Sequence, residues 1–331
     1  MIFVWVGPRI AKAPVPAITK PPNPKSPNNM AKSVLSRYLD PETLSHVADR
    51  HIDPRGLVIG NLAGAHKSPL SGFAVEFAGH REYVPGDDPK HIDWRVYFNR
   101  DKYFVKQYEL ETNFVCHLLL DVSASMRYGD DREQKLLYAA QMATTLGYSI
   151  IRQSDKVSLA TFDQRLRGFV PPSNSLGQIV RMTQHLDETE AVEKTNLADA
   201  LNEFAGRLGR REIIFIFSDF FGDLDKLEPA LQRLRYSKHE VVLFQVLHHD
   251  ELVFEFDGMI KFLGLEIPEE LLAQPEDLRR GYLQALQRFN QHFEEIALRN
   301  GCERVLVDTR RSMSELLADY INQRSLQARA R

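Results

Sequence analysis

Apolar and polar positions follow two different rhythms along this chain, and the change falls near residue 113. Before it, residues 56–100 mix turn residues with short apolar patches, and residues 102–111 alternate polar and apolar positions like an antiparallel strand. After it, continuous apolar runs such as FVCHLLLD (114–121) and EIIFIFSD (212–219) predict strands of a parallel sheet buried on both faces. Segments with an apolar stripe at helical spacing lie between such runs.

The second part of the chain therefore alternates between strand and helix. Strands are predicted at 114–121, 156–162, 166–172, 212–219, 240–248 and 302–309, and helices at 133–153, 175–186, 196–208, 224–236, 276–301 and 312–324. A short polar and aromatic insertion, 251–266, precedes the long helix at 276–301. This alternation predicts a doubly wound α/β domain with a mostly parallel sheet over residues 113–325.

An accessory region over residues 30–112 is predicted in front of this domain. It opens with a short helix in DPETLSHVADRHI, where Asp40 is the expected N-cap and Pro41 the first helical residue. The rest of the region is expected to be irregular or β structure. Residues 1–29 carry many prolines and few core-forming residues, so we expect disorder there, or a start-site artefact with the true start at Met30. Residues 326–331 are expected to form a basic, solvated tail.

Composition narrows the class of protein. The chain has 331 residues, a net charge of −3 and two cysteines, Cys116 and Cys302. The charge is too balanced for a dedicated nucleic-acid binder, and two cysteines do not make a disulfide framework. No apolar run is long enough to span a membrane, and the N-terminus is a poor fit to a signal peptide. We therefore expect a cytoplasmic protein.

The side chains that could bind a ligand or a metal lie where the predicted strands end. Asp121 and Asp219 each close an apolar strand, Ser123 and Ser125 follow Asp121, and Thr195 precedes the helix at 196–208. Because functional groups of open parallel sheets collect at the carboxyl ends of the strands, these five side chains are expected to converge. Hard oxygen donors suit Mg²⁺ or Mn²⁺. The simpler alternative is that they are turn and helix-capping residues. The metal site is expected to be a cluster of surface loops, outside the core.

The five residues are similar to a known kind of metal site. DVSAS with the distant Thr195 and Asp219 resembles the metal-ion-dependent adhesion site of von Willebrand factor A domains. The segments GAHKSPLSGFAVEF, REYVPGDDPKHIDWR and KQYELET are similar to signature segments of the family called domain of unknown function 58. This likeness covers nearly all of residues 40–324. It implies a von Willebrand factor A-like fold and a partnership with MoxR-type AAA+ ATPases.

The resemblance also implies how the site works. In such sites the serines and the threonine bind the metal directly, and the aspartates act through water. Neutral hydroxyl ligands leave the ion's charge poorly compensated, so a carboxylate from the ATPase or from its client completes the coordination. We therefore expect a non-enzymatic, metal-dependent protein-interaction module, working in the assembly or maturation of other proteins.

Two further clusters invite an interpretation. In GDDPKHIDWR, the residues Asp87, Asp88, Asp93, Trp94 and Arg95 form a possible secondary interaction site. The favoured interpretation is a turn at 86–89, with Asp93 and Arg95 bracing the accessory region against the α/β domain and Trp94 in the core. In LHHDE, the side chains His248, His249 and Asp250 look like metal ligands, but polar residues are expected at any strand end.

Rival functions remain open at this point. The alternative is a Mg²⁺-dependent phosphoryl-transfer or hydrolytic enzyme, since such enzymes also place a strand-end aspartate on Mg²⁺. The haloacid dehalogenase pattern needs a second carboxylate where this chain has Ser123. The sequence holds neither a GxxxxGK[ST] phosphate loop nor a GxSxG serine elbow. An extracellular adhesin would need an export signal. Neither the client protein nor the oligomeric state follows from the sequence.

Overall fold

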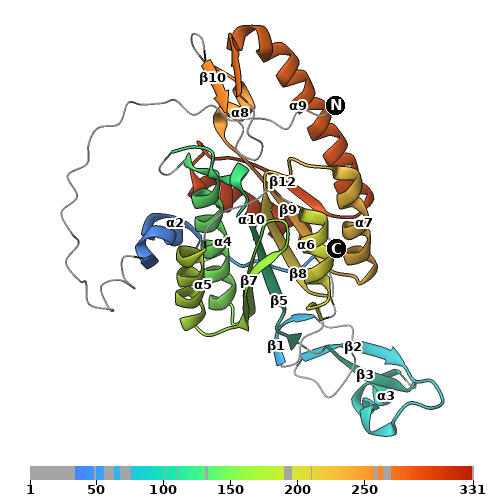
Figure 1. Ribbon diagram of the computed structural model, residues 1–331. Coiled ribbons are helices and arrows are strands. Elements are labelled where there is room, and N and C mark those ends of the chain that lie inside the picture. The colour runs from blue at the N-terminus through green and yellow to red at the C-terminus, as the bar shows by residue number, and fades with distance from the viewer. Residues whose placement is uncertain are drawn as a thin grey trace, which may run out of the picture.

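The central feature is a sheet of six strands in the order β12-β9-β8-β5-β6-β7. The structure, a computed structural model, describes residues 34–47, 50–55, 63–67, 76–100, 102–109, 111–130, 133–189, 196–209, 211–256, 260–263 and 270–329. All neighbouring strands of the sheet are parallel except β6 and β7, which pair antiparallel. The predicted doubly wound, mostly parallel sheet is therefore confirmed (Figure 1).

The elements agree closely with the predicted alternation. The sheet comprises β5 (Val115–Asp121), β6 (Lys156–Phe162), β7 (Leu166–Ser173), β8 (Ile213–Ser218), β9 (Glu240–Leu247) and β12 (Glu303–Asp308). The helices packed on it are α2 (Pro41–Val47), α4 (Lys135–Arg152), α5 (Gly177–Glu188), α6 (Leu197–Ala205), α7 (Leu224–Tyr236), α9 (Pro275–Arg299) and α10 (Met313–Arg329). The last helix thus continues to Arg329, into the segment expected to be a tail.

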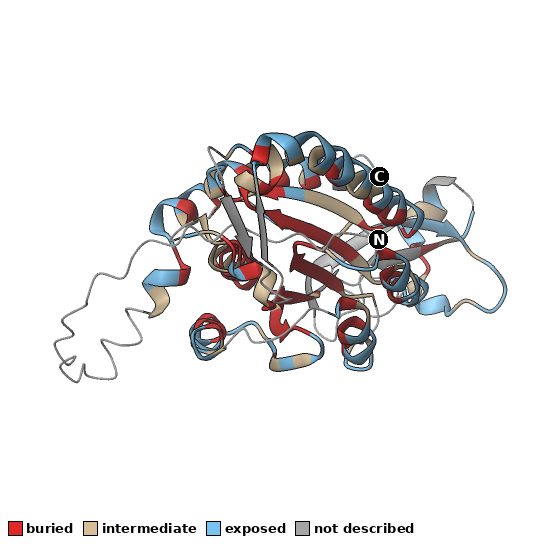
Figure 2. Ribbon diagram, turned by 45° about the horizontal axis from the view of Figure 1, so that its top comes forward, coloured by how far each residue is buried: buried red, intermediate tan, exposed pale blue. Residues whose placement is uncertain are grey.

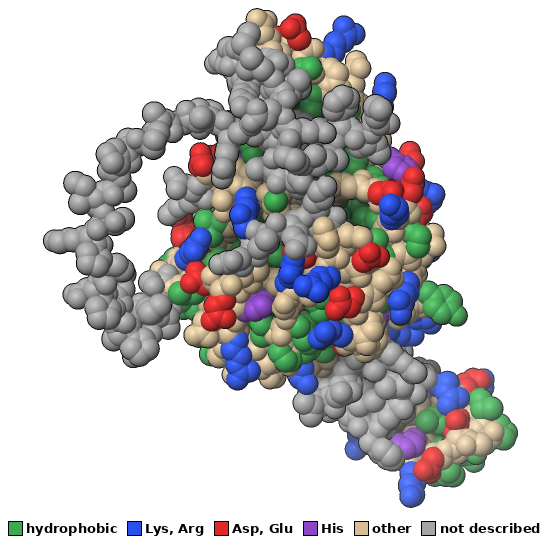
Figure 3. Space-filling view, in the orientation of Figure 1, with side chains coloured by type: hydrophobic (Ala, Val, Ile, Leu, Met, Phe, Trp, Pro, Cys, Tyr) green, Lys and Arg blue, Asp and Glu red, His purple; other side chains and the backbone are tan. Residues whose placement is uncertain are grey.

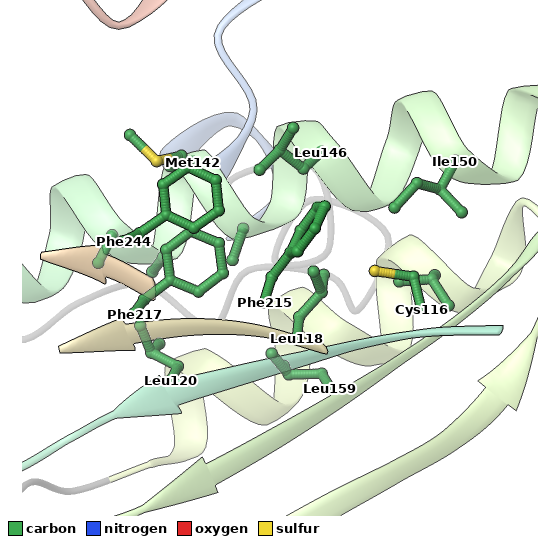
Figure 4. Close-up of a cluster of buried hydrophobic side chains, with 14 of the residues drawn as sticks. Cys116, Leu118, Leu120, Met142, Leu146, Ile150, Leu159, Phe215, Phe217 and Phe244 are labelled. Atoms are coloured by element: carbon green, nitrogen blue, oxygen red, sulfur yellow. The ribbon is translucent and has the colours of Figure 1, made fainter. Parts of the chain in front are cut away.

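Two apolar cores lie on the two faces of the sheet. Helices α4, α5 and α10 cover one face, with α2 packed against α4 and α10, and α6, α7 and α9 cover the other face. Figure 2 shows the buried strands between layers of helices whose outer sides are exposed. On the first face, Cys116, Leu118 and Leu120 of β5 point toward Leu146 and Ile150 of α4 (Figure 4). Burial on both faces explains why these strands are apolar throughout.

The strand order reverses between β5 and β8. From β5 the chain passes through α4 to β6 and β7 on one side, and then returns through α5 and α6 to β8, on the other side of β5. The loops after these two strands therefore leave in opposite directions and open a crevice at the carboxyl edge. In open α/β sheets, this switch point is where ligands bind.

The predicted accessory region falls into two parts. Its first helix, α2, packs on the domain core through Val47, and Asp40 accepts a hydrogen bond from the Thr43 backbone N–H at 3.1 Å, as expected of the N-cap. Two short strands, β1 (Ala63–Lys67) and β4 (Glu111–Thr112), form an antiparallel pair. Beyond them, β2 (Glu76–Glu82) and β3 (Phe104–Glu109) form a hairpin that carries a short 3₁₀ helix, η1 (Pro89–His91), and α3 (Trp94–Arg100). This unit projects away from the sheet (Figure 1).

The insertion before α9 folds into small elements at the opposite end. It contains the short helix α8 (His249–Val253) and an antiparallel pair, β10 (Ile260–Leu263) with β11 (Glu270–Ala273). Figure 1 shows this pair beside the first turns of α9, away from the projecting hairpin. Within the described part of the chain, none of the helices has the length and apolar character needed to cross a bilayer.

Candidate metal centre

Asp121 lies at the carboxyl end of β5, at the switch point, and is fully buried. Its Oδ1 accepts a hydrogen bond from the Ser123 backbone N–H at 2.9 Å. Its Oδ2 accepts one from the Ser218 hydroxyl, at the end of β8, at 2.6 Å. Asp121 therefore joins the two strands that flank the switch point. This burial corrects the expectation of a site on a surface loop, because the carboxylate lies below the rim of the crevice.

Ser123 and Ser125 lie on the loop that leaves β5 and runs into the short 3₁₀ helix η2 (Ala124–Arg127). Ser123 occupies the N-cap position of η2, yet its side chain makes no capping hydrogen bond. Its hydroxyl instead lies 3.1 Å from the hydroxyl of Ser125. The simpler capping interpretation therefore does not account for Ser123, and the two hydroxyls stand together beside Asp121.

Asp219 follows β8 and is almost fully buried. Its Oδ1 accepts a hydrogen bond from the Phe221 backbone N–H at 3.1 Å. The N-cap of the following helix α7 is Asp223, whose side chain accepts from the Lys226 N–H. Asp219 is thus not the capping residue that its position after a strand suggested. Its second oxygen, Oδ2, is directed to a buried lysine.

That lysine, Lys135, was missed by the sequence analysis, as was its second partner, Glu251. The Nζ of Lys135 lies 2.8 Å from Oδ2 of Asp219 and 2.9 Å from Oε1 of Glu251. All three side chains are buried. Lys135 opens α4, and Glu251 lies in α8, where it also accepts from the His248 backbone N–H at 2.7 Å. The only sequence signal was a lysine on the otherwise apolar side of a predicted helix.

The electrostatics of these groups are strongly coupled. Burial, and after it the neighbouring charge of Asp219, raise the pKa of Asp121 to about 7, although the hydrogen bonds from Ser218 and Ser123 oppose the rise. Burial also raises the pKa of Glu251, although Lys135 opposes this. Burial alone would lower the pKa of Lys135, but the two carboxylates outweigh it and raise the pKa. Asp219 thus has a buried cation of its own in Lys135.

A cavity of about 400 Å³ opens beside this cluster. It is bordered by Ser218, by Phe220 and Phe221 after β8, and by the first turns of α6 and α7. Phe220 has a φ of 59°, a conformation that bulky residues rarely adopt. Its N–H donates to the Ser218 hydroxyl at 3.0 Å, and its ring packs against Phe293 at 4.7 Å between centroids. Such strain persists only where the surroundings enforce it, and it is typical of functional sites.

Thr195, the fifth predicted site residue, lies outside the described residues. Its neighbour Asn196 is described, and the Asn196 N–H donates to the carbonyl of Asp163, after β6, at 3.1 Å. Asn196 also caps α6 through its side chain and borders the cavity. The structure therefore brings together Asp121, Ser123, Ser125 and Asp219, and the placement of Thr195 stays a prediction.

The secondary cluster turns out differently from its favoured interpretation. Asp87 accepts from the Val84 N–H at 2.9 Å and pairs with Arg81 at 2.8 Å, and Asp88 caps η1, so the predicted turn is confirmed. Asp93 pairs with His80 at 2.8 Å and accepts from the Arg95 N–H at 3.0 Å. These contacts hold the projecting hairpin together, so the expected bracing against the α/β domain was wrong.

Trp94 is also not a core residue. Trp94 is 52% exposed, because the hairpin projects away from the sheet and none of the described helices or strands covers this side of it. The His-rich cluster after β9 is accounted for by local pairs. His248 caps α8, and His249 lies 2.8 Å from Asp308. Among the described residues, no group of three His, Cys, Asp or Glu side chains is arranged to hold a metal ion.

Fold and site together define a doubly wound α/β protein whose switch point holds two buried aspartates and two serine hydroxyls. Residues 79–292 match the family described as protein of unknown function DUF58. The match spans more than half of the chain, and the chain belongs to this family. The family likeness expected from the sequence is thus confirmed.

Relatives and solved structures extend the comparison. The uncharacterised proteins Rv1480 of Mycobacterium tuberculosis and Mb1516 of Mycobacterium bovis are each 22% identical over 241 residues, which cover 72% of this chain and 73% of theirs. The conserved hypothetical protein BatB from Bacteroides thetaiotaomicron has a TM-score of 0.44 at 15% identity, over 64% of this chain and 99% of that one. The SpRpn10 VWA domain has a TM-score of 0.38 at 11% identity, over 62% and 94%. The fold of this chain is defined by its own strand order.

Proposed function

We propose that this chain is a non-enzymatic, metal-dependent protein-interaction module whose switch-point site binds a carboxylate of a protein partner through Mg²⁺ or Mn²⁺. The observation that carries the proposal is the convergence of Asp121 and Asp219 with the paired hydroxyls of Ser123 and Ser125. The donors are all oxygen, which suits a small hard cation. Asp121, Ser123, Ser125 and Asp219 would hold the ion, and Thr195 is the expected fifth residue.

Lys135 adds a second argument, from charge. It already compensates Asp219 and Glu251, so an ion in the site would meet less negative charge than two bare aspartates offer. The serine hydroxyls add none. An ion held in this way keeps an affinity for a further anionic ligand, and a glutamate or aspartate of a partner supplies one. The cavity beside Ser218 gives the residues that flank such a carboxylate a place to pack.

The proposed partner is a MoxR-type AAA+ ATPase or a client protein delivered to it. This part of the proposal rests on the resemblance of the signature segments to those of the family. The site chemistry is compatible with it, because any acidic side chain on an exposed loop meets the requirement.

The alternative is a Mg²⁺-dependent phosphoryl-transfer enzyme, in which Asp121 would attack a phosphorus atom. Asp121 is fully buried, and both of its oxygens accept hydrogen bonds. A nucleophile must reach the reacting atom, and a general base must stand within hydrogen-bond reach of the proton it takes. The geometry therefore favours a role in holding an ion over a role in attack.

The experiment is a pull-down of a MoxR-type ATPase from the same organism, with Mg²⁺ and with chelator. Wild type should retain the ATPase in Mg²⁺ and lose most of it in chelator, and both Ser123→Ala and Thr195→Ala should retain little in either. Ser237→Ala, at an exposed position on the opposite edge of the sheet, is the matched control and should behave like wild type. Equal recovery in every lane would refute the proposal.

A further inference from the structure

The projecting hairpin carries a group of aromatic side chains that the proposed metal site does not use. Four large apolar side chains on it are exposed: Val84 (54%), Trp94 (52%), Phe98 (82%) and Tyr103 (47%). We call these four residues the aromatic face. Ring contacts join Trp94, Phe98 and Tyr103 into one group through Tyr97. Side chains exposed singly are ordinary, but a contiguous apolar group on a projecting unit marks an interaction site. At the end of this unit, Figure 3 shows hydrophobic side chains next to charged ones.

The aromatic face is held in a fixed arrangement. The ring of Tyr97 stacks on Tyr103, with centroids 4.5 Å apart and an interplanar angle of 10°. Trp94 meets both rings edge-on, at 6.1 Å and 6.3 Å. A backbone hydrogen bond holds the neighbours of Trp94 and Tyr103 together, because the Asp93 N–H donates to the Phe104 carbonyl at 2.8 Å. Rings that are already ordered lose little entropy on binding, which favours affinity.

The charges around the aromatic face indicate the sign of the charge expected on the partner. Lys90 and Arg95 are exposed, and among the described carboxylates none pairs with either. The nearby acids are engaged: Asp87 with Arg81, Glu82 with Lys102, Asp93, which is buried, with His80, and Asp88 with the backbone N–H of Lys90. Residues 76–112 as a whole hold six Lys and Arg against eight Asp and Glu. The positive charge offered to a partner is therefore that of Lys90 and Arg95, which have no carboxylate partner among the described residues.

We propose that the aromatic face, together with Lys90 and Arg95 on the same hairpin, is a second docking surface that binds an acidic protein surface bearing exposed apolar side chains, independently of metal. Tryptophan, tyrosine and arginine are the residues that carry most binding energy in protein interfaces, and here they form one preorganised group. Complementary charge steers the encounter and sets the orientation. A hairpin that projects from the body can reach a partner while the sheet edge is engaged elsewhere. This inference does not rest on the proposed metal site.

The test is site-specific photo-crosslinking of the full chain in cells. A benzophenone amino acid replaces Phe98, and a matched control carries it at Tyr236 on α7, which is similarly exposed and belongs to the α/β domain and not to the hairpin. Phe98 should crosslink to one protein, through a segment rich in Asp and Glu with apolar side chains between them. The Tyr236 control should not yield this adduct. The crosslink should persist in chelator.

Two variants decide the outcome. In binding measured with that purified protein, Arg95→Glu should weaken affinity about tenfold, with less loss at high salt, since a rim charge acts through long-range attraction. Trp94→Ala should weaken it about 30-fold, as for a central aromatic anchor. Arg95 is exposed, so its variant should fold even if Trp94→Ala does not. The proposal would be overturned by crosslinks to lipid, to nucleic acid, to a second copy or to this chain's own residues. It would also be overturned by a partner segment without acidic residues, or by the absence of any adduct.

Discussion

The Nζ of Lys135 lies 2.8 Å from Oδ2 of Asp219, and both groups are buried at the point where the strand order reverses. The same Nζ reaches Glu251 at 2.9 Å. One lysine at the start of α4 thus connects the loop after β8 with the short helix after β9. Two of the loops that border the crevice are held together through one charge.

Removing that charge should destabilise the fold. Lys135→Met leaves two buried carboxylates without their cation, and breaking a buried ion pair from one side costs about 3–5 kcal/mol. We expect the free energy of unfolding, measured by urea titration, to fall by that amount. Added Mg²⁺ should stabilise the variant more than wild type, because the ion supplies positive charge beside Asp219.

A matched control is available on the hairpin. Lys102 pairs with Glu82 at 3.0 Å, but both side chains are largely exposed. Exposed pairs contribute roughly 0–1 kcal/mol, so Lys102→Met should change stability very little. Equal effects of Lys135→Met and Lys102→Met would show that the buried pair has no special weight.

Magnesium binding should depend on pH near neutrality. Burial and the neighbouring Asp219 raise the pKa of Asp121 to about 7, so the metal-free protein carries a proton there below that pH. The ion needs the carboxylate, which must lose this proton. The apparent affinity for Mg²⁺ should therefore be full above about pH 8 and fall about tenfold by pH 6.

Calorimetry measures this directly. Titrations at pH 8 and pH 6 should show the loss of affinity, and titrations in two buffers of different ionisation enthalpy should reveal the proton released on binding. A carboxylate with an ordinary pKa would give the same affinity at both values of pH. That result would mean that Asp121 is not part of the ion site or is better solvated than its burial indicates.

Catalysis should be absent. The purified chain should hydrolyse neither nucleotides nor p-nitrophenyl phosphate above background, because Asp121 is buried and both of its oxygens are engaged. The assay should include Asp219→Asn in parallel. A rate that follows the protein through purification and disappears in that variant would favour the enzyme.

The sequence predicted much of the fold and of the site. Apolar runs and helical stripes placed β5, β8 and their flanking helices, and the strand-end positions of Asp121 and Asp219 placed the crevice. It could not predict that Lys135 pairs with Asp219 and Glu251. These partners lie 84 and 116 residues from the lysine along the chain. A lysine in the first turn of a helix is ordinarily solvated. Only the packing of α4 beneath the crevice buries this one.

The projecting hairpin illustrates a second limit. Trp94 was expected in the core because a large aromatic residue usually packs inside. Local pattern cannot show that β2 and β3 carry their residues away from the sheet, since that direction depends on how the chain leaves β1 and returns through β4. Exposure of the aromatic face follows from topology and not from residue type.

A metal ion that bridges this chain to a carboxylate of its partner must couple the binding of the ion to the binding of the partner. If Mg²⁺ tightens binding of the MoxR-type ATPase by some factor, the ATPase must tighten Mg²⁺ binding by the same factor. Calorimetric titration of Mg²⁺ into the chain alone and into its complex should show a rise in affinity of about 10–100-fold, equivalent to about 1.4–2.8 kcal/mol. Ser123→Ala should abolish most of this rise. Identical Mg²⁺ affinities with and without the ATPase would contradict the account, because an ion that bridges two proteins cannot be indifferent to one of them.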